Sequence, residues 1–202
     1  LLGEKVVEAF YKNLEEIEKI GCNVVRFATQ IIDGEGETIS KVFGHPKLEK
    51  ATDSFWRKFK GETRSSLSEY IFSRVAYSKY GFKDYPLAWH SDDMAWLEFS
   101  FFENIFSINS KVIKIRESVI SISGRKDNSI LKTTASHFFY FYLSDNYIDK
   151  FSKCQKIGLI NKVEKYFFQN KSSFLFVKLL KWHIINNSVI NLIKFIRRTY
   201  LN

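Results

Sequence analysis

Two adjacent carboxylates, Asp92 and Asp93, are the residues of this chain best placed to do chemistry. They follow a turn-rich aromatic loop over residues 80–91 and come directly before an apolar segment that begins at Met94. Neighbouring aspartates repel each other, whereas the free N–H groups and the positive dipole end at a helix N-terminus favour carboxylates. The pattern predicts a helix start at which one carboxylate caps the helix and the other faces a cleft. The competing interpretation is that Ser91 and Asp92 only cap the helix.

The same loop carries side chains that suit the recognition of sugars. Tyr85 and Trp89 offer aromatic faces that stack on the apolar faces of sugar rings, and the His90 imidazole and Ser91 hydroxyl can bind sugar hydroxyls. The ordinary alternative is that these side chains pack in the core. A hydrolytic triad of His90, Ser91 and Asp92 is excluded, because three consecutive side chains cannot form the required relay and no nucleophile elbow is present.

Basic and metal-binding residues give weaker signals. Arg74, Arg116 and Arg125 can bind phosphate groups of a donor or acceptor, although such arginines more often form surface ion pairs. No metal site is predicted, because Cys22 and Cys154 lie far apart and lack zinc-ligand spacing. Two isolated cysteines fit a reducing, cytoplasmic setting.

The elements that must position these residues follow from periodicity, which predicts an α/β fold. Helical spacing of apolar residues predicts a surface helix from Val6 that ends at Gly21. The Asp-Gly turn at 33–36 predicts a hairpin rather than a metal site. Strands are predicted over residues 23–32, 38–43, 68–73 and 111–122. Further helices are predicted over residues 48–60, 75–80 and 94–102.

The pattern becomes helical throughout from residue 129, with expected breaks at 145–146 and 169–170. We therefore expect two regions. Residues 1–128 form a partial mixed sheet with flanking helices, and residues 129–202 form a C-terminal helical appendix.

Composition predicts a folded protein with a sizeable core, since 45% of the 202 residues are hydrophobic and 17% are aromatic. The net charge of +9 concentrates toward the C-terminus, where residues 174–200 mix basic and apolar side chains. These helices either pack on the core or rest on an anionic membrane surface. No uncharged run reaches the roughly 20 residues needed to span a bilayer. Nucleic acid is not expected, because the basic residues do not form a recognisable binding motif.

The sequence around the two aspartates resembles glycosyltransferase family 2, whose bacterial members have the GT-A fold. That family often carries Phe-x-Arg, a short helix, Gly-Phe-x-Asp/Glu and, after a gap, Glu-Asp or Asp-Asp at a helix start. Phe72-Ser73-Arg74, Gly81-Phe82-Lys83-Asp84 and Asp92-Asp93 stand here in that order and spacing. The resemblance extends over roughly the first 130 residues, and the aspartate loop is its most specific part.

The resemblance implies an inverting transfer of a sugar from a nucleotide-sugar donor to a saccharide acceptor during surface polysaccharide synthesis. Asp93 occupies the position of the general base, and Asp92 replaces the more usual Glu and supports it. The loop residues Tyr85, Trp89, His90 and Ser91 then contact the acceptor. A basic nucleic-acid-binding module and a non-catalytic membrane-associated interaction protein remain the alternatives.

The family also carries an Asp-x-Asp motif that holds a divalent metal against the nucleotide diphosphate. This sequence contains neither that motif nor a glycine-rich phosphate loop. We therefore expect the nucleotide site and most ligands of the Mg or Mn ion to lie outside this chain, which alone would be incomplete and inactive. The expected location is the cytoplasm, at the inner face of the cell membrane.

Overall fold

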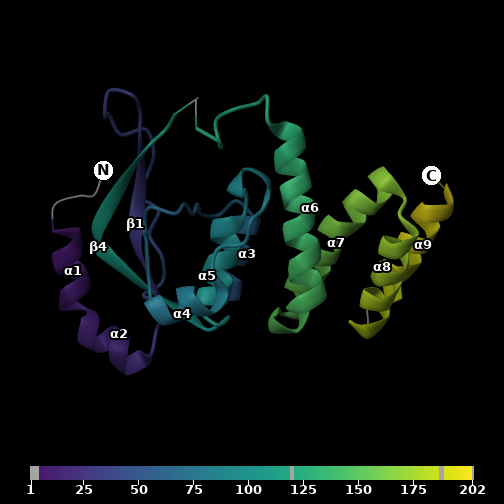
Figure 1. Cartoon of the computed structure of the whole chain (residues 1–202), viewed down its shortest axis with the longest axis horizontal. Helices are drawn as coiled ribbons and strands as arrows, with labels where there is room; N and C mark the ends of the chain where they lie inside the picture. The colour runs from purple at the N-terminus through teal and green to yellow at the C-terminus, as the bar shows by residue number, and fades with distance from the viewer. Residues whose placement is uncertain (1–4, 119–120, 187–188, 202) are drawn as a thin grey trace. The chain divides into compact units, whose positions relative to one another are not determined.

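The computed structural model describes residues 5–118, 121–186 and 189–201, and the chain divides into two units between Lys132 and Thr133. The first unit combines a sheet with helices, and the second is helical (Figure 1). Four strands and nine α-helices lie in these described ranges. The predicted α/β class with a mixed sheet followed by helices is confirmed.

The four strands of the first unit form one mixed sheet. They are β1 (Val24–Ile32), β2 (Leu48–Lys50), β3 (Tyr70–Phe72) and β4 (Asn104–Arg116), and their order across the sheet is β2-β4-β1-β3. The long central strands β1 and β4 pair in parallel, while β2 and β3 pair antiparallel at the two edges.

Helices cover both faces of this sheet. The short helices α1 (Val6–Lys12) and α2 (Leu14–Ile20) lie against one face, and α3 (Ala51–Phe59), α4 (Arg74–Tyr80) and α5 (Ser91–Phe99) lie on the other (Figure 1). The helix predicted from Val6 divides at Asn13 but ends, as expected, at Gly21, which adopts the left-handed conformation with φ 76°.

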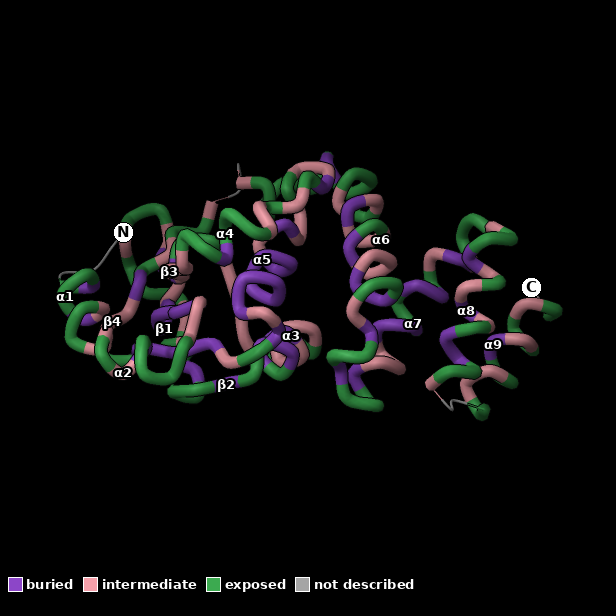
Figure 2. The backbone as a smooth tube through the Cα atoms, turned by 60° about the horizontal axis from the view of Figure 1, so that its bottom comes forward, coloured by how far each residue is buried: buried purple, intermediate pink, exposed green. Residues whose placement is uncertain are grey.

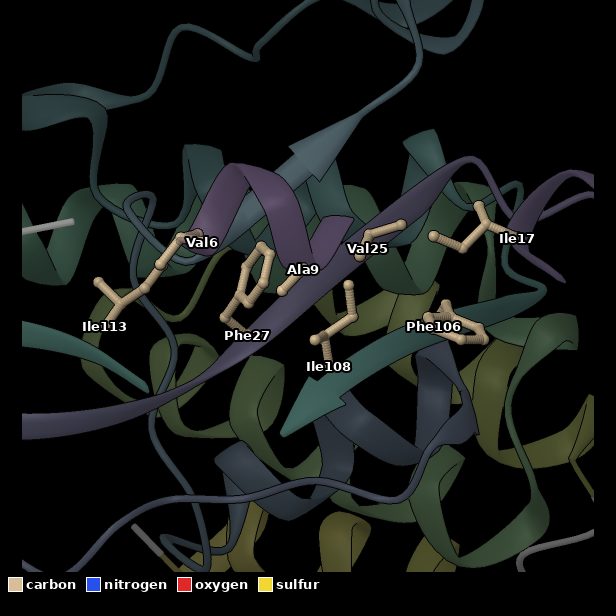
Figure 3. Packing of buried hydrophobic residues seen from close by; sticks show 8 residues of the cluster. All are labelled: Val6, Ala9, Ile17, Val25, Phe27, Phe106, Ile108 and Ile113. Atoms are coloured by element: carbon tan, nitrogen blue, oxygen red, sulfur yellow. The ribbon is translucent and has the colours of Figure 1, made fainter. Parts of the chain in front are cut away.

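One hydrophobic core lies between the sheet and the first two helices. On β1, Val25 and Phe27 point into it, whereas Arg26 between them is bonded to Ser54 of α3 on the opposite face. This alternation is the period of two expected for a strand. The cluster consists of Val6, Ala9, Ile17, Val25, Phe27, Phe106, Ile108 and Ile113 (Figure 3).

Two predicted strand ranges are corrected. Residues 38–43 form only isolated bridges, Thr29 with Phe43 and Ile32 with Thr38, because the side chain of Ser40 binds the backbone N–H of Ile31 in place of a regular ladder. The last strand begins at Asn104 and ends at Arg116 instead of covering 111–122. Residues 119–120 of that prediction lie outside the described ranges.

Two predicted helix ranges are also corrected. The helix predicted over 48–60 begins only at Ala51, because residues 48–50 pair with β4 as strand β2. The helix predicted over 94–102 covers Ser91–Phe99, and Phe102 after it has a left-handed φ of 63°. Every residue of this helix, α5, except Asp92 is buried (Figure 2).

The second unit is built from α-helices around its own core. Its helices are α6 (Ser129–Asn146), which starts in the first unit, α7 (Lys153–Asn170), α8 (Ser173–Ile185) and α9 (Val189–Leu201). The breaks predicted at 145–146 and 169–170 are confirmed. Helix is also confirmed for 174–185 and 189–200; Asn186 between them is a turn residue that ends α8, and residues 187–188 lie outside the described ranges. The core comprises Ile148, Ile160, Val163, Phe167, Leu175, Leu179, Trp182 and Phe195. None of the helices described here is long and apolar enough to span a membrane.

Candidate functional site

Asp92 and Asp93 lie inside the first turn of α5, because the helix begins at Ser91 and not at Met94 as the sequence suggested. The residue before the helix is His90, with a left-handed φ of 70° and no capping bond from its side chain. The predicted cap by Ser91 is therefore wrong, since Ser91 is buried and its hydroxyl donates to the carbonyl oxygen of Lys83 at 2.6 Å. Asp92 does accept the backbone N–H of Asp93 at 2.9 Å.

Both carboxylate oxygens of Asp93 are held by neighbouring side chains. Lys58 of α3 donates to Oδ1 at 2.5 Å, and Nδ1 of His90 lies 2.8 Å from Oδ2. The Asp93 side chain is only 6% exposed. Burial works to raise its pKa, but the charge of Lys58 and the hydrogen bond from His90 outweigh burial and lower the pKa to about 2. Asp93 is therefore an ionised, fixed carboxylate at neutral pH.

The two aspartates have different electrostatic environments although they are adjacent. Burial and the charge of Asp93 raise the pKa of Asp92. For Lys58, burial opposes the charged form, but the charges of Asp93 and Asp92 raise its pKa overall. Divergent pKa values in neighbouring acids are common where one acid accepts a proton and the other supports it.

A small cavity lies beside Asp93, between α3, α5 and the sheet. Its volume is about 20 Å³, enough for roughly one water molecule. Besides Asp93, its lining includes Lys58, Arg64, Tyr70 and Trp96. The indole of Trp96 is fixed by stacking on Tyr70, with ring centroids 4.0 Å apart.

Two hydrogen-bond donors on the cavity wall are unsatisfied. Nε1 of Trp96 and Nη1 of Arg64 are buried and have no hydrogen-bond partner within the part of the chain that the structure describes. A buried donor without a partner costs about 1–3 kcal/mol. The cavity therefore offers a carboxylate and donors to an oxygen atom that carries a proton.

A buried ionic network supports the cavity from the sheet side. Arg26, which is 1% exposed and lines the cavity, pairs with Glu49 and donates to Ser107 at 2.9 Å. Glu49 is also bound by Arg57, through Nε at 2.6 Å and Nη2 at 2.8 Å. Burial alone would raise the pKa of Glu49, but the hydrogen bonds from the two arginines lower it.

His45 ends this network and makes folding sensitive to acid. Its Nδ1 lies 3.1 Å from Nη2 of Arg57, and burial together with the charges of Arg26 and Arg57 lowers its pKa to about 3. The unfolded chain protonates this histidine below about pH 6.5, whereas the folded chain does so only near pH 3. Its contribution to the free energy of unfolding is therefore lost as the pH falls through that interval.

We expect His45→Gln to flatten the pH dependence of stability between about pH 6.5 and pH 3. The measurement is the free energy of unfolding in urea at several pH values, for the variant and the wild type. Parallel curves for the two proteins would contradict this assignment.

The loop before α5 holds strained backbone. It contains the 3-10 turn η1 (Pro86–Ala88), and Leu87, Ala88 and His90 all have left-handed φ values of 60°, 51° and 70°. A left-handed residue other than glycine costs roughly 1–2 kcal/mol. Such strain gathers where function fixes the chain, and here it places His90 against Asp93.

The aromatic residues predicted on this loop occupy different environments. Tyr85 is buried, 9% exposed, so it packs beneath the loop instead of presenting a face to solvent. Trp89 is half-buried, and Nζ of Lys132 lies 5.0 Å from the centroid of its ring. His90 bonds to Asp93, as described, and Trp89 lies beside it with ring centroids 5.7 Å apart.

The three predicted phosphate-binding arginines do not line the cavity. Arg74 is exposed at the start of α4. Arg116 donates to the backbone carbonyls of the 33–36 turn, and Arg125 pairs with Asp127 at 2.5 Å. The cations that do line the cavity are Lys58, Arg64 and Arg26.

Sequence reasoning missed these three cations. One signal was present for Arg26, because a charged residue in the middle of the apolar run 24–32 must find a buried partner. Lys58 and Arg64 carried no local signal.

The described ranges contain no group of three or more His, Cys, Asp or Glu side chains that could hold a metal ion, so we assign no step to one. The fold and the site together define an α/β protein with two adjacent aspartates at a helix start, of which Asp93 is buried. Comparisons with protein-family models, curated proteins and solved structures give no match to this chain.

Proposed function

We propose that this chain is the acceptor-side part of a GT-A-type glycosyltransferase and that Asp93 is its general base. The observation that carries the proposal is the cavity beside Asp93. A carboxylate and the nitrogen donors of Lys58, Arg64 and Trp96 line a space with room for about one oxygen atom. A sugar hydroxyl suits this set, because its oxygen accepts hydrogen bonds while its proton needs an acceptor.

In the proposed reaction, the acceptor hydroxyl oxygen attacks the anomeric carbon of the nucleotide-sugar. The bond from that carbon to the diphosphate breaks on the opposite side, and its electron pair leaves with the diphosphate. The hydroxyl proton moves to Asp93, and the single displacement inverts the anomeric configuration. Because the pKa of Asp93 is about 2, we infer that the proton moves late, after bond formation has acidified the hydroxyl.

The neighbouring groups have separate roles in this proposal. Lys58 and His90 hold the Asp93 carboxylate in one orientation, and Asp92 fixes the helix start through the N–H of Asp93. Trp89 offers an aromatic surface to the acceptor ring at the same loop. The order of β3, α4, the loop and α5 matches the order of motifs in glycosyltransferase family 2, which the sequence resembles, and this match supports the proposal.

A transfer assay tests the proposal. The complete polypeptide that contains this chain is incubated with a panel of nucleotide-sugars and saccharide acceptors, and products are identified by mass and by the NMR coupling of the anomeric proton. We expect a product of inverted configuration. Failure to transfer from every donor, together with no saccharide-induced shifts in the NMR spectrum of this chain, would overturn the proposal.

A further inference from the structure

The second unit carries nearly all of the net charge of the protein. From Thr133 to the C-terminus there are eleven lysines and arginines but three aspartates and glutamates, a net charge of +8 out of +9 for the whole chain. No acidic residue follows Glu164. The last 38 residues are therefore purely basic among their charged side chains, which favours an anionic partner.

Helix α9 presents an apolar surface away from its core. Phe195 is fully buried and anchors the helix, while the side chains at helical spacing on the opposite side are exposed. The exposed apolar residues are between 60% and 81% accessible: Val189, Ile190, Ile193, Tyr200 and Leu201. Lys194 and Arg197 are exposed on the same helix. Apolar residues flanked by cations are the pattern of a helix that lies in a membrane interface.

Helix α8 carries a second exposed stripe of the same kind. Leu175, Leu179 and Trp182 face the core, whereas a row spaced three, four and three residues apart faces outward. The apolar members of that outward side are Phe174, Val177, Ile184 and Ile185, each more than half exposed. Lys181 is exposed within the same row.

The two exposed surfaces meet at a hollow of about 310 Å³ between α7, α8 and α9. Val177 of α8 and Tyr200 of α9 line it together with Phe168 and Lys171. Its volume lies at the lower end of the roughly 300–1,000 Å³ of ligand pockets. Four of the eight lining residues are aromatic and one is a lysine, a combination that suits an acyl chain whose headgroup carries a negative charge.

We propose that the surface formed by the exposed side chains of α8 and α9 binds peripherally to an anionic lipid bilayer. The apolar side chains enter the region between headgroups, and the basic side chains contact lipid phosphates, since long cationic side chains can bury their stems and keep the charge at the headgroups. A bilayer offers both an apolar layer and anionic headgroups to this surface, whereas nucleic acid would leave the exposed isoleucines unused. This inference does not depend on the proposed transferase function.

Co-sedimentation of the full chain with lipid vesicles tests the proposal. We expect binding to vesicles with about one third phosphatidylglycerol and little binding to vesicles of phosphatidylcholine alone. Raising the salt from about 0.1 M to about 1 M should weaken the binding strongly, because the screening length falls from about 10 Å to about 3 Å.

Variants separate the two contributions. Ile190→Glu with Ile193→Glu should lower vesicle affinity more than tenfold, and each of Lys194→Gln and Arg197→Gln should lower it roughly fivefold. Val75→Glu, at a position 72% exposed on α4, is the matched control and should leave binding unchanged. Circular dichroism confirms that each variant is folded.

Three outcomes would overturn the proposal. The first is equal binding to neutral and anionic vesicles, and the second is unchanged binding in the isoleucine variant. The third is a dimer in sedimentation velocity that the isoleucine variant dissociates, because the surface would then bind a second copy of the chain.

Discussion

Under the proposed transferase function, Asp93→Asn is expected to lower the rate of sugar transfer by roughly 10²- to 10⁴-fold, the usual effect of losing a proton-transfer group. Asparagine keeps the shape of the side chain and can still bind Lys58 and His90, but it cannot accept the hydroxyl proton. The affinity for the nucleotide-sugar should hardly change, because the variant alters only the acceptor side. Initial rates at saturating donor and acceptor measure the effect.

Two control variants distinguish a base from a structural residue. Asp149→Asn, with a side chain 88% exposed in the second unit, should transfer at the wild-type rate. Lys58→Met keeps the carboxylate but removes the charge that lowers the pKa of Asp93, so its activity should decline at a higher pH than that of the wild type on acidification. Near-normal transfer by Asp93→Asn would show that Asp93 only orders the helix start.

Glu49→Ala should lower the free energy of unfolding by about 3–5 kcal/mol, the largest stability effect that we expect. The variant leaves Arg26, which is 1% exposed, without the carboxylate that balances its charge, and it also removes the partner of Arg57. Urea unfolding at neutral pH measures the loss. The variant should also disturb the cavity beside Asp93, because the side chain of Arg26 forms part of the cavity wall.

The matched control is Glu62→Ala, which breaks the ion pair between Lys60 and Glu62. The side chain of Lys60 is 43% exposed and that of Glu62 is 49% exposed. Exposed pairs contribute about 0–1 kcal/mol, so this variant should unfold almost like the wild type. Replacing both Arg26 and Glu49 by methionine should recover much of the lost stability, because no buried charge is then left unpaired. Equal losses for Glu49→Ala and Glu62→Ala would contradict the role assigned to the network.

Local sequence patterns predicted the parts of the fold that local physics determines. The apolar, β-branched run at 24–32 became β1, and the left-handed Gly21 ended α2, since both depend on neighbouring residues. The position of Asp92 and Asp93 at a helix start was likewise readable from the residues around them. The strand β2 was not, because residues 48–50 are extended only through pairing with β4, more than fifty residues later.

The interior of the candidate site could not be predicted for the same reason. Lys58 reaches Asp93 across 35 residues of sequence, and Arg26 reaches Glu49 across 23. Neither spacing belongs to a recurring motif. The strained φ values at Leu87, Ala88 and His90 also lie outside what residue type indicates, since none of these three is glycine or asparagine.

The parallel pairing of β1 with β4 has a consequence for how the protein acquires its fold. Arg26 pairs with Ser107, 81 residues away, so the centre of the sheet closes only after nearly the whole first unit has emerged from the ribosome. Such long-range closure slows folding, whereas a helical unit rich in local contacts folds quickly. The first unit, which holds the acid pair, should therefore be the slower to mature, and its apolar strands are the segments most exposed to aggregation during synthesis.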